Sequence, residues 1–136
     1  MQYRLLDPPG WDEIPEQVRA ELKCGPGDGV LERLVPDVWW FGYPLYKPLR
    51  ITPSCGRHDA EYRWLAPPSE LGRELADLRF RKNTCRQTFN EGGPDWLLRH
   101  RLNRCYEYWW SVRKFGYQAF WGDRVAAMRG GVLAHS

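Results

Sequence analysis

His58 and Asp59 are the residues whose types and position best suit chemistry. They are neighbours in the segment Cys55-Gly56-Arg57-His58-Asp59-Ala60-Glu61-Tyr62, which we expect to be helical. Adjacent side chains on a helix point about 100° apart, so these two do not pair with each other. They suit two tasks around one centre instead. The aspartate can bind a hard cation such as Ca²⁺, while the imidazole handles a proton.

Tyr62 and Asp77 are the candidates to support this histidine. Tyr62 lies four residues after His58 on the same helix face, and its hydroxyl can brace a neighbouring carboxylate. Asp77 falls in the next predicted helix, which runs antiparallel and brings the carboxylate toward the imidazole, where it would fix the tautomer and orientation. The alternative is a surface ion pair between Asp77 and an arginine of its own helix, either Arg73, Arg79 or Arg81.

A glycine-rich run precedes these helices. Cys24-Gly25-Pro26-Gly27-Asp28-Gly29 cannot continue a helix and predicts a tight loop. Its backbone can adopt positive φ and offers carbonyl oxygens, the ligands that Ca²⁺ prefers. Taken alone, the run is more typical of a simple turn.

The elements that must position these residues are mostly helices. The length of 136 residues predicts one domain, and hydrophobic residues, 43% of the chain, can form its core. The helical segments along the chain predict the all-α class. We expect an N-terminal arm over 1–16 with a turn at Pro8-Pro9-Gly10, and a loose tail over 122–136. Between them the pattern predicts a short helix (14–23), irregular or extended chain (30–52), the helix that carries His58 (from Pro53 to Trp64), and two longer helices (70–89, capped by Ser69, and 95–115, stopped by Gly116).

Composition excludes several classes of protein. The formal charge of +3 is far from the dense basic run of a dedicated nucleic-acid binder, so no nucleic-acid partner is expected. No apolar stretch approaches the roughly 20 residues that span a bilayer, and the first residues lack a signal-peptide core. We therefore expect a protein made in the cytoplasm. Its four cysteines, Cys24, Cys55, Cys85 and Cys105, form three alternative sets of disulfides or stay buried as free thiols.

The order of these motifs resembles the phospholipase A2 superfamily. Cys24-Gly25-Pro26-Gly27-Asp28 is similar to the calcium loop of its viral capsid-borne members, and Cys55-x-x-His58-Asp59-x-x-Tyr62 to the catalytic-helix signature. Ala76-Asp77-x-x-Phe80 resembles the second-helix motif, and Cys85 is placed like a cysteine of the small bacterial enzymes. The resemblance covers about residues 23–86. It implies two antiparallel core helices, a calcium loop and a long C-terminal helix.

The resemblance also implies roles for individual residues. Ca²⁺ would be held by the Asp59 carboxylate and three backbone carbonyls, those of Lys23, Gly25 and Gly27. His58 would take a proton from the attacking water while Asp77 orients it and Tyr62 braces the carboxylate. Ca²⁺ would polarise the sn-2 ester carbonyl, with the backbone N–H of Gly25 as oxyanion donor. Cys24 would pair with Cys55, which leaves Cys85 with Cys105.

Two other segments carry open alternatives. The cluster Trp39-Trp40-Phe41 is interpreted as core, or as an anchor at the headgroup level of a membrane. The last helix carries basic residues at Arg99, His100, Arg101, Arg104, Arg113 and Lys114. They form a solvated face, attract anionic headgroups, or, with the interleaved aromatics, stack on single-stranded nucleic acid.

The functional expectation is a Ca²⁺-dependent phospholipase A2-type carboxylic ester hydrolase that acts at a phospholipid membrane surface. By analogy with the viral relatives, we expect a phage or prophage protein that aids envelope penetration or lysis, is associated with the virion or released on lysis, and has other virion proteins as partners. The alternative is a catalytically inactive virion or assembly protein that keeps the helical scaffold.

Overall fold

The computed structural model describes residues 2–22, 36–122 and 124, and it is mostly helical in them. The described elements follow in the order η1 (Trp11–Glu13), α1 (Glu16–Arg19), β1 (Val38–Trp39), β2 (Leu49–Arg50), α3 (Thr52–Ala60), η2 (Glu61–Leu65), α4 (Glu70–Glu91) and α5 (Asp95–Phe115). A further helical stretch covers 117–122. The expected all-α class is confirmed, with one short two-stranded sheet added to it.

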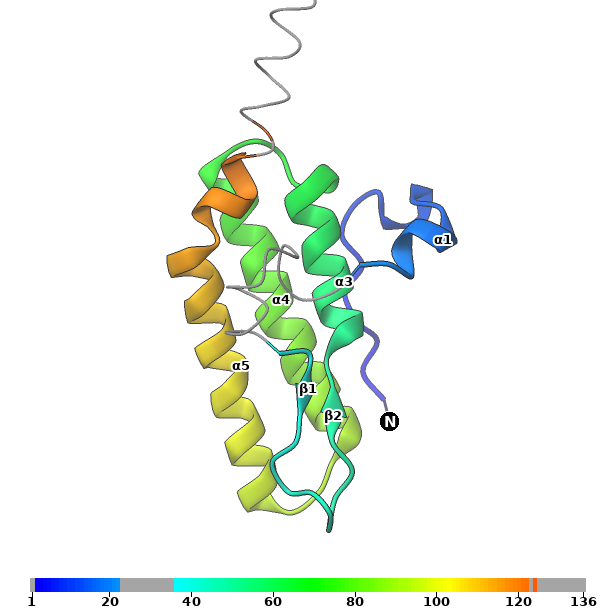
Figure 1. Ribbon diagram of the computed structural model, residues 1–136, viewed down its shortest axis with the longest axis vertical. Helices are drawn as coiled ribbons and strands as arrows, with labels where there is room; N and C mark the ends of the chain where they lie inside the picture. The colour runs from blue at the N-terminus through cyan, green and yellow to red at the C-terminus, as the bar shows by residue number, and fades with distance from the viewer. Residues whose placement is uncertain (1, 23–35, 123, 125–136) are drawn as a thin grey trace, which may run out of the picture.

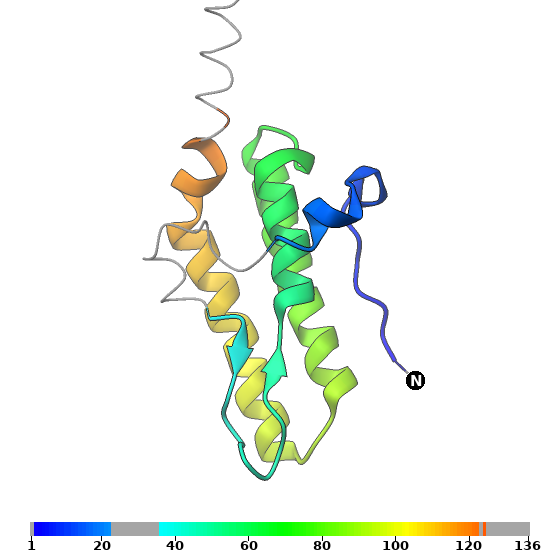
Figure 2. The same cartoon turned by 45° about the vertical axis from the view of Figure 1, so that its right-hand side comes forward.

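Three helices form the body of the molecule. α3 and α4 run antiparallel, and α5 returns alongside α4, so that α4 lies between the other two (Figure 1). Figure 2, in which α3 lies in front of α4, shows the N-terminal segment along one side of α4. Among the helices of the described residues, none has the length and apolar character that crossing a membrane requires.

The ends of α4 follow from local chemistry. Ser69 accepts a hydrogen bond from the Gly72 N–H at 3.0 Å, so the predicted N-cap is confirmed. The helix stops where Gly92 and Gly93 both take positive φ, at 71° and 111°, a conformation that favours glycine. α4 thus runs two residues beyond the predicted 70–89. The bounds of α5 agree with the predicted 95–115.

The helix that carries His58 changes its winding partway along. We expected a single α-helix as far as Trp64, but α3 ends at Ala60 and continues as the π-helix η2. The Ala66 N–H donates to the Glu61 carbonyl at 3.0 Å, a pairing five residues apart instead of four. Wider turns of this kind rotate the side chains that follow and recur at functional sites.

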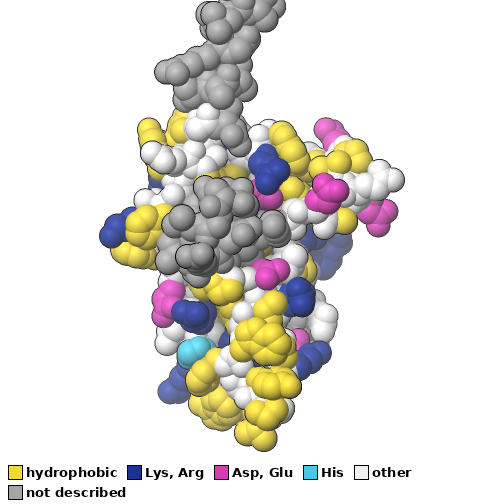
Figure 3. All heavy atoms as spheres, in the orientation of Figure 1, with side chains coloured by type: hydrophobic (Ala, Val, Ile, Leu, Met, Phe, Trp, Pro, Cys, Tyr) yellow, Lys and Arg dark blue, Asp and Glu magenta, His cyan; other side chains and the backbone are white. Residues whose placement is uncertain are grey.

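The segment before α3 forms a hairpin. β1 and β2 pair antiparallel, with Val38 opposite Arg50, which confirms the expected short extended structure for its described part. The hairpin loop and the start of α5 expose six large side chains, here called the aromatic tip: Trp40, Phe41, Tyr43, Leu45, Tyr46 and Trp96. Figure 3 shows hydrophobic side chains gathered at this end of the molecule.

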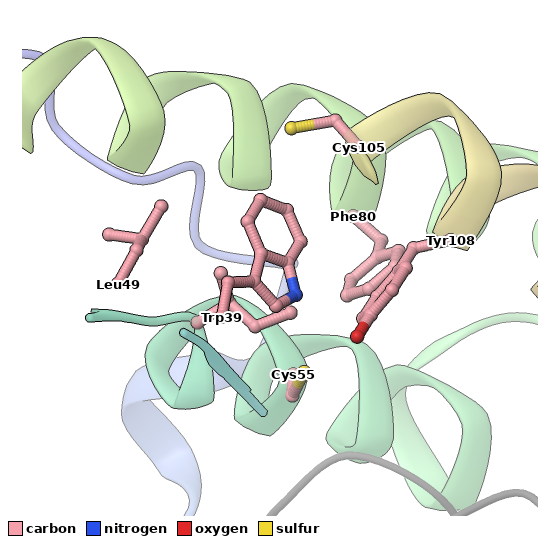
Figure 4. Close-up of a cluster of buried hydrophobic side chains, with 7 residues drawn as sticks. Trp39, Leu49, Cys55, Phe80, Cys105 and Tyr108 are labelled. Atoms are coloured by element: carbon pink, nitrogen blue, oxygen red, sulfur yellow. The ribbon is translucent and has the colours of Figure 1, made fainter. Parts of the chain in front are cut away.

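The main core lies between the hairpin and the three helices (Figure 4). Trp39 is only 4% exposed and packs edge-on against Tyr108 of α5, with ring centroids 5.1 Å apart. A second cluster holds the N-terminal segment on α3, where Trp11, Ile14 and Leu22 surround Ala60. The expected turn at Pro8-Pro9-Gly10 is present, with the Trp11 N–H bonded to the Pro8 carbonyl at 3.0 Å.

The cysteines depart in part from the expected pairing. Cys55 is in a disulfide, while its expected partner Cys24 lies outside the described residues. Cys85 and Cys105 are both free, so their expected disulfide is absent. Cys85 packs against the core cluster that contains Cys105, and Cys105 is fully buried. The pair therefore contributes to the core as packed thiols.

Replacing Gly72 with alanine tests the start of α4. A Cβ there would lie 2.3 Å from the Pro67 carbonyl oxygen, and this backbone cannot move aside without disturbing the Ser69 cap. We expect Gly72→Ala to lower the free energy of unfolding by about 1–3 kcal/mol, measured by urea denaturation.

Gly56→Ala is the matched control, because a Cβ at Gly56 would meet its nearest neighbour at an ordinary 3.6 Å. It should leave stability unchanged or raise it by up to about 1 kcal/mol, since alanine favours a helix. Equal effects of the two substitutions would contradict the packing argument.

Candidate active site

The imidazole of His58 is bonded to the carboxylate of Asp77. Its Nε2 lies 2.7 Å from Oδ1 of Asp77, which confirms the predicted meeting of α3 and α4. The Asp77 side chain is completely buried, so the surface ion-pair alternative is wrong. A carboxylate at Nε2 favours the tautomer that carries its proton on this nitrogen, and Nδ1 is then the nitrogen that can accept one.

Three more groups converge on the same carboxylate. The Tyr62 hydroxyl donates to Oδ1 at 2.6 Å, as the sequence predicted. Arg113 of α5 donates from Nη1 to Oδ2 at 2.8 Å, and Nη1 of Arg73 lies 3.8 Å from Oδ2. Both oxygens of Asp77 are therefore occupied by donors from α3, η2 and α5, and α4 supplies the carboxylate itself.

Charge and burial act in opposite directions on Asp77. Burial alone would raise the pKa of this carboxyl group, but the hydrogen bonds from His58, Tyr62 and Arg113 outweigh it and hold the pKa below its usual range. Burial, followed by the charge of Asp77, raises the pKa of Tyr62 well above the ordinary tyrosine value. Asp77 is therefore an anion at neutral pH, and Tyr62 keeps the proton that it donates.

Aromatic rings hold the His58 imidazole in place. The ring of Tyr62 lies 4.2 Å from it and that of Phe80 4.7 Å, centroid to centroid. The His58 side chain keeps 11% of its surface exposed. The imidazole is thus oriented by packing and by Asp77 while part of it still reaches the surface, which is the arrangement that a general base requires.

Sequence reasoning missed the partners that hold η2. Arg79, considered as a partner for Asp77, instead donates through Nε to the buried Glu61 at 2.8 Å. Arg124 donates from Nη2 to the carbonyls of Glu61 and Ala66 at 3.0 and 2.8 Å, and from Nη1 to the carbonyl of Tyr62. These bonds satisfy carbonyls along the wide turn and so keep Tyr62 facing Asp77.

Arg113 was also missed as a site residue. The sequence places it in the last turn of a basic helix, where a solvated or lipid-facing role is the natural expectation. Nothing local distinguishes it from Lys114 or Arg104. Its role follows only from the packing of α5 on α4, which brings together two residues 36 positions apart in the chain.

The predicted calcium ligands are only partly described. Lys23, Gly25 and Gly27 lie outside the described residues, as does the predicted oxyanion donor at Gly25. Within the part of the chain that the structure describes, no group of three or more His, Cys, Asp or Glu residues could hold a metal ion. Asp59 has a carboxylate of the right chemistry, and its side chain is 10% exposed, with Nε of Arg63 at 2.9 Å from Oδ1. A cation there would share this carboxylate with Arg63 or displace it.

The chain on either side of 23–35 is held against α3. Leu22 packs so closely that a Cβ on Gly56 would lie 3.6 Å from its own Cβ. At the other side, Thr52 donates its hydroxyl to the Asp37 carboxylate at 2.5 Å. Both contacts are on the helix that carries His58 and Asp59.

Comparison with known proteins finds no match: no protein-family model, curated protein or solved structure is significantly similar to the chain. The resemblance to phospholipase A2 therefore stays a prediction, and the function is argued from the geometry of the site.

Asp77→Asn tests the electrostatic role of the buried carboxylate. The substitution keeps the shape but leaves Arg113 and Arg73 facing a neutral group, so at pH 7 we expect a loss of about 3–5 kcal/mol in the free energy of unfolding. Because folding lowers the Asp77 pKa, its stabilisation is complete above the unfolded-state pKa of about 3.9 and is lost as pH falls through the folded-state value. The difference between wild type and variant should therefore shrink at pH 3.

Urea denaturation at pH 7 and pH 3 measures this difference. Asp12→Asn serves as the control, since Asp12 is exposed in η1, and it should shift stability by less than about 0.5 kcal/mol. A loss for Asp77→Asn that is the same at both pH values would contradict the assignment.

Proposed function

We propose that this protein is a Ca²⁺-dependent hydrolase of the phospholipase A2 type, which cleaves the sn-2 ester of glycerophospholipids at a membrane surface. The single observation that carries the proposal is the 2.7 Å contact between Nε2 of His58 and the buried Asp77. Support comes from Tyr62, which braces the same carboxylate at 2.6 Å, and from Asp59, the next residue on the helix. The proposed setting, a phage or prophage protein that aids envelope penetration or lysis, rests on the sequence resemblance alone.

In the proposed mechanism, His58 acts through Nδ1. Asp77 holds the proton of Nε2, so Nδ1 presents a lone pair to a water molecule and takes its proton as that water attacks the ester carbonyl. The imidazolium that forms is stabilised by the Asp77 anion and returns its proton to the glycerol oxygen as the sn-2 acyl C–O bond breaks, which releases the fatty acid and regenerates the neutral imidazole. Tyr62 and Arg113 keep that anion ionised and immobile, so the carboxylate does not need to reorganise during the step.

Asp59 and the backbone carbonyls of Lys23, Gly25 and Gly27 are the proposed holders of Ca²⁺. When bound, Ca²⁺ would supply a Lewis acid for the ester carbonyl. The backbone N–H of Gly25 is the proposed second donor to that oxygen. Oxygen-only ligands of this kind match the preference of Ca²⁺.

The aromatic tip supports a membrane as partner. The two interpretations of Trp39-Trp40-Phe41, core or membrane anchor, apply to different residues. Trp39 is part of the core, whereas Trp40 is 59% and Phe41 48% exposed. Phe41 stacks on His100 at 3.7 Å and meets Trp96 edge-on at 6.0 Å, so the tip is a preformed surface. Exposed aromatic rings held together in this way suit the headgroup region of a bilayer.

Basic residues lie beside the aromatic tip. Lys47 in the hairpin loop and Arg99 in the first turns of α5 are exposed. Arg99 would add about 1 kcal/mol of attraction to an anionic membrane, and Lys47 would add less, because it already pairs with Glu91 at 3.3 Å. We therefore propose that the tip docks on membranes rich in anionic lipid.

The second candidate is a virion or assembly protein that keeps this scaffold without turnover. The contact between Arg63 and Asp59 at 2.9 Å favours it, because a guanidinium on the carboxylate competes with a cation. The two functions differ in whether fatty acid is released in the presence of Ca²⁺.

His58→Gln tests the catalytic proposal. With a short-chain phosphatidylcholine dispersed as monomers and Ca²⁺ present, we expect fatty-acid release by the wild type and a loss of at least about 100-fold in the variant, because general-base catalysis contributes that much. Removal of Ca²⁺ by a chelator and the substitution Asp59→Asn should each abolish release.

His100→Gln is the matched control, since this histidine stacks on Phe41 of the aromatic tip and a dispersed substrate needs no docking. It should retain the wild-type rate. Full activity in His58→Gln would overturn the mechanism, and a wild type that is folded but inactive with Ca²⁺ would favour the virion or assembly candidate.

Substitutions in the aromatic tip test the membrane partner. We expect Trp40→Ser combined with Leu45→Ser to weaken binding to phosphatidylglycerol vesicles by at least about tenfold, because two exposed apolar side chains are removed from the docking surface. Vesicle sedimentation measures the binding. The control is Trp64→Ser, which removes a tryptophan of similar exposure, 52%, at the far end of η2. Equal losses for the tip and control variants would rule out docking by the tip.

A further inference from the structure

The first part of the N-terminal segment, residues 2–7 and from here on called the arm, lies against α4 without forming a helix or a strand. It runs along the side of this helix in an extended course (Figure 2). Its side chains are mostly exposed, among them Tyr3 at 54%. Hydrophobic burial therefore contributes little to its attachment, and the polar contacts must account for its position.

Two asparagines of α4 bind the backbone of the arm. Asn90 accepts from the Tyr3 N–H at 2.7 Å and donates to the Tyr3 carbonyl at 2.8 Å. Asn83 likewise accepts from the Leu6 N–H at 2.6 Å and donates to the Leu6 carbonyl at 3.0 Å. Each side-chain amide satisfies the N–H and the C=O of one residue, as a neighbouring β-strand would.

The spacing of these contacts is commensurate with an extended chain. Asn83 and Asn90 are seven residues apart, which is about 10.5 Å along a helix at 1.5 Å per residue. Tyr3 and Leu6 are three residues apart, which is about 10 Å in extended chain at roughly 3.3 Å per residue. The arm runs antiparallel to α4, because Tyr3 meets the later asparagine. Two turns of the helix therefore separate the two side-chain amides by the same distance that separates two residues three positions apart in an extended strand.

Three further contacts complete the site. Arg86, midway between the asparagines, donates to the Arg4 carbonyl at 2.7 Å. Arg57 donates through Nε to the Asp7 carboxylate at 2.8 Å, and the ring of Tyr3 lies 6.3 Å from that of Phe89. The backbone contacts do not depend on sequence. The last two contacts favour an aromatic residue and, four positions later, an acidic one.

We propose that this face of α4 is a binding site for an extended polypeptide segment. The site is formed by the row Asn83, Arg86 and Asn90, with Arg57 beside it. The arm fills the site in cis, and a segment of another chain with an aromatic residue and, four positions later, an acidic one fills it in trans. The arm can leave without opening the core, because the chain after it is held separately by Trp11, Ile14 and Leu22 on α3. The inference does not depend on hydrolase activity.

The test uses the full chain with its arm weakened. Asp7→Lys places two cations together at Arg57 and should release the arm. The probe is a fluorescent peptide with the sequence of residues 2–9, and its binding is followed by anisotropy. We expect the peptide to bind Asp7→Lys at least about tenfold more tightly than wild type, in which the arm competes.

Methylation of the peptide backbone separates this site from nonspecific adhesion. N-methyl groups at the positions of Tyr3 and Leu6 remove the two N–H donors to the asparagines and should weaken binding by at least about tenfold, because both hydrogen bonds are lost. The same methyl at Leu5 is the control and should be tolerated. Equal binding of all three peptides, or no binding to folded Asp7→Lys, would overturn the proposal.

Substitution of the asparagines gives an independent arm of the experiment. Asn90→Leu in the Asp7→Lys background should weaken the unmodified peptide, whereas Lys82→Leu, at an exposed position of α4, should not. Circular dichroism checks that each variant is folded. Undiminished binding to folded Asn90→Leu would also count against the site.

Discussion

The buried carboxylate of Asp77 is the constraint on which the rest of the structure depends. An anion removed from water is stabilised only by donors that reach it, and here these come from α3, η2 and α5. Three segments must therefore keep fixed positions around α4. The helix packing and the orientation of His58 thus have a common cause, since displacement of any one segment leaves a charge or a donor unsatisfied.

A buried ion network of this kind is a weak argument for stability by itself. Apolar residues of similar volume would often stabilise a core as well or better. What the network does supply is a defined proton arrangement, with Nε2 of His58 engaged and Tyr62 held as a donor. The wide turn of η2 and the bonds from Arg124 to its carbonyls help to hold Tyr62 in this orientation. A buried ion network and a π-helical turn are each less favourable in free energy than an apolar core and a plain α-helix, and such turns recur at functional sites. Their presence therefore favours a functional interpretation of the site.

α4 meets a different neighbour on each of its faces. One face carries Asp77 and Phe80 toward the histidine, and another packs on α5 through Cys85 and Cys105. A third presents Asn83 and Asn90 to the arm. The proposed site, the core and the proposed peptide site therefore share one rigid element, while the aromatic tip lies at the end of the hairpin and the start of α5.

Much of the secondary structure and the central pair of the site could be predicted from the sequence, because the signals are local. The Ser69 cap, the glycines after Glu91 and the apolar period define α4 and α5 nearly to the residue, and the spacing of His58, Tyr62 and Asp77 on two adjacent helices predicts their meeting. Tertiary packing alone decided the remainder. Arg113 rather than Arg79 reaches the far oxygen of Asp77, Cys85 and Cys105 stay free thiols, and Trp39 is buried beside an exposed Trp40. A carboxylate accepts any guanidinium that approaches it, and a tryptophan is buried wherever partners surround it. Which partner arrives depends on how segments distant in the chain pack together, and no local pattern records that.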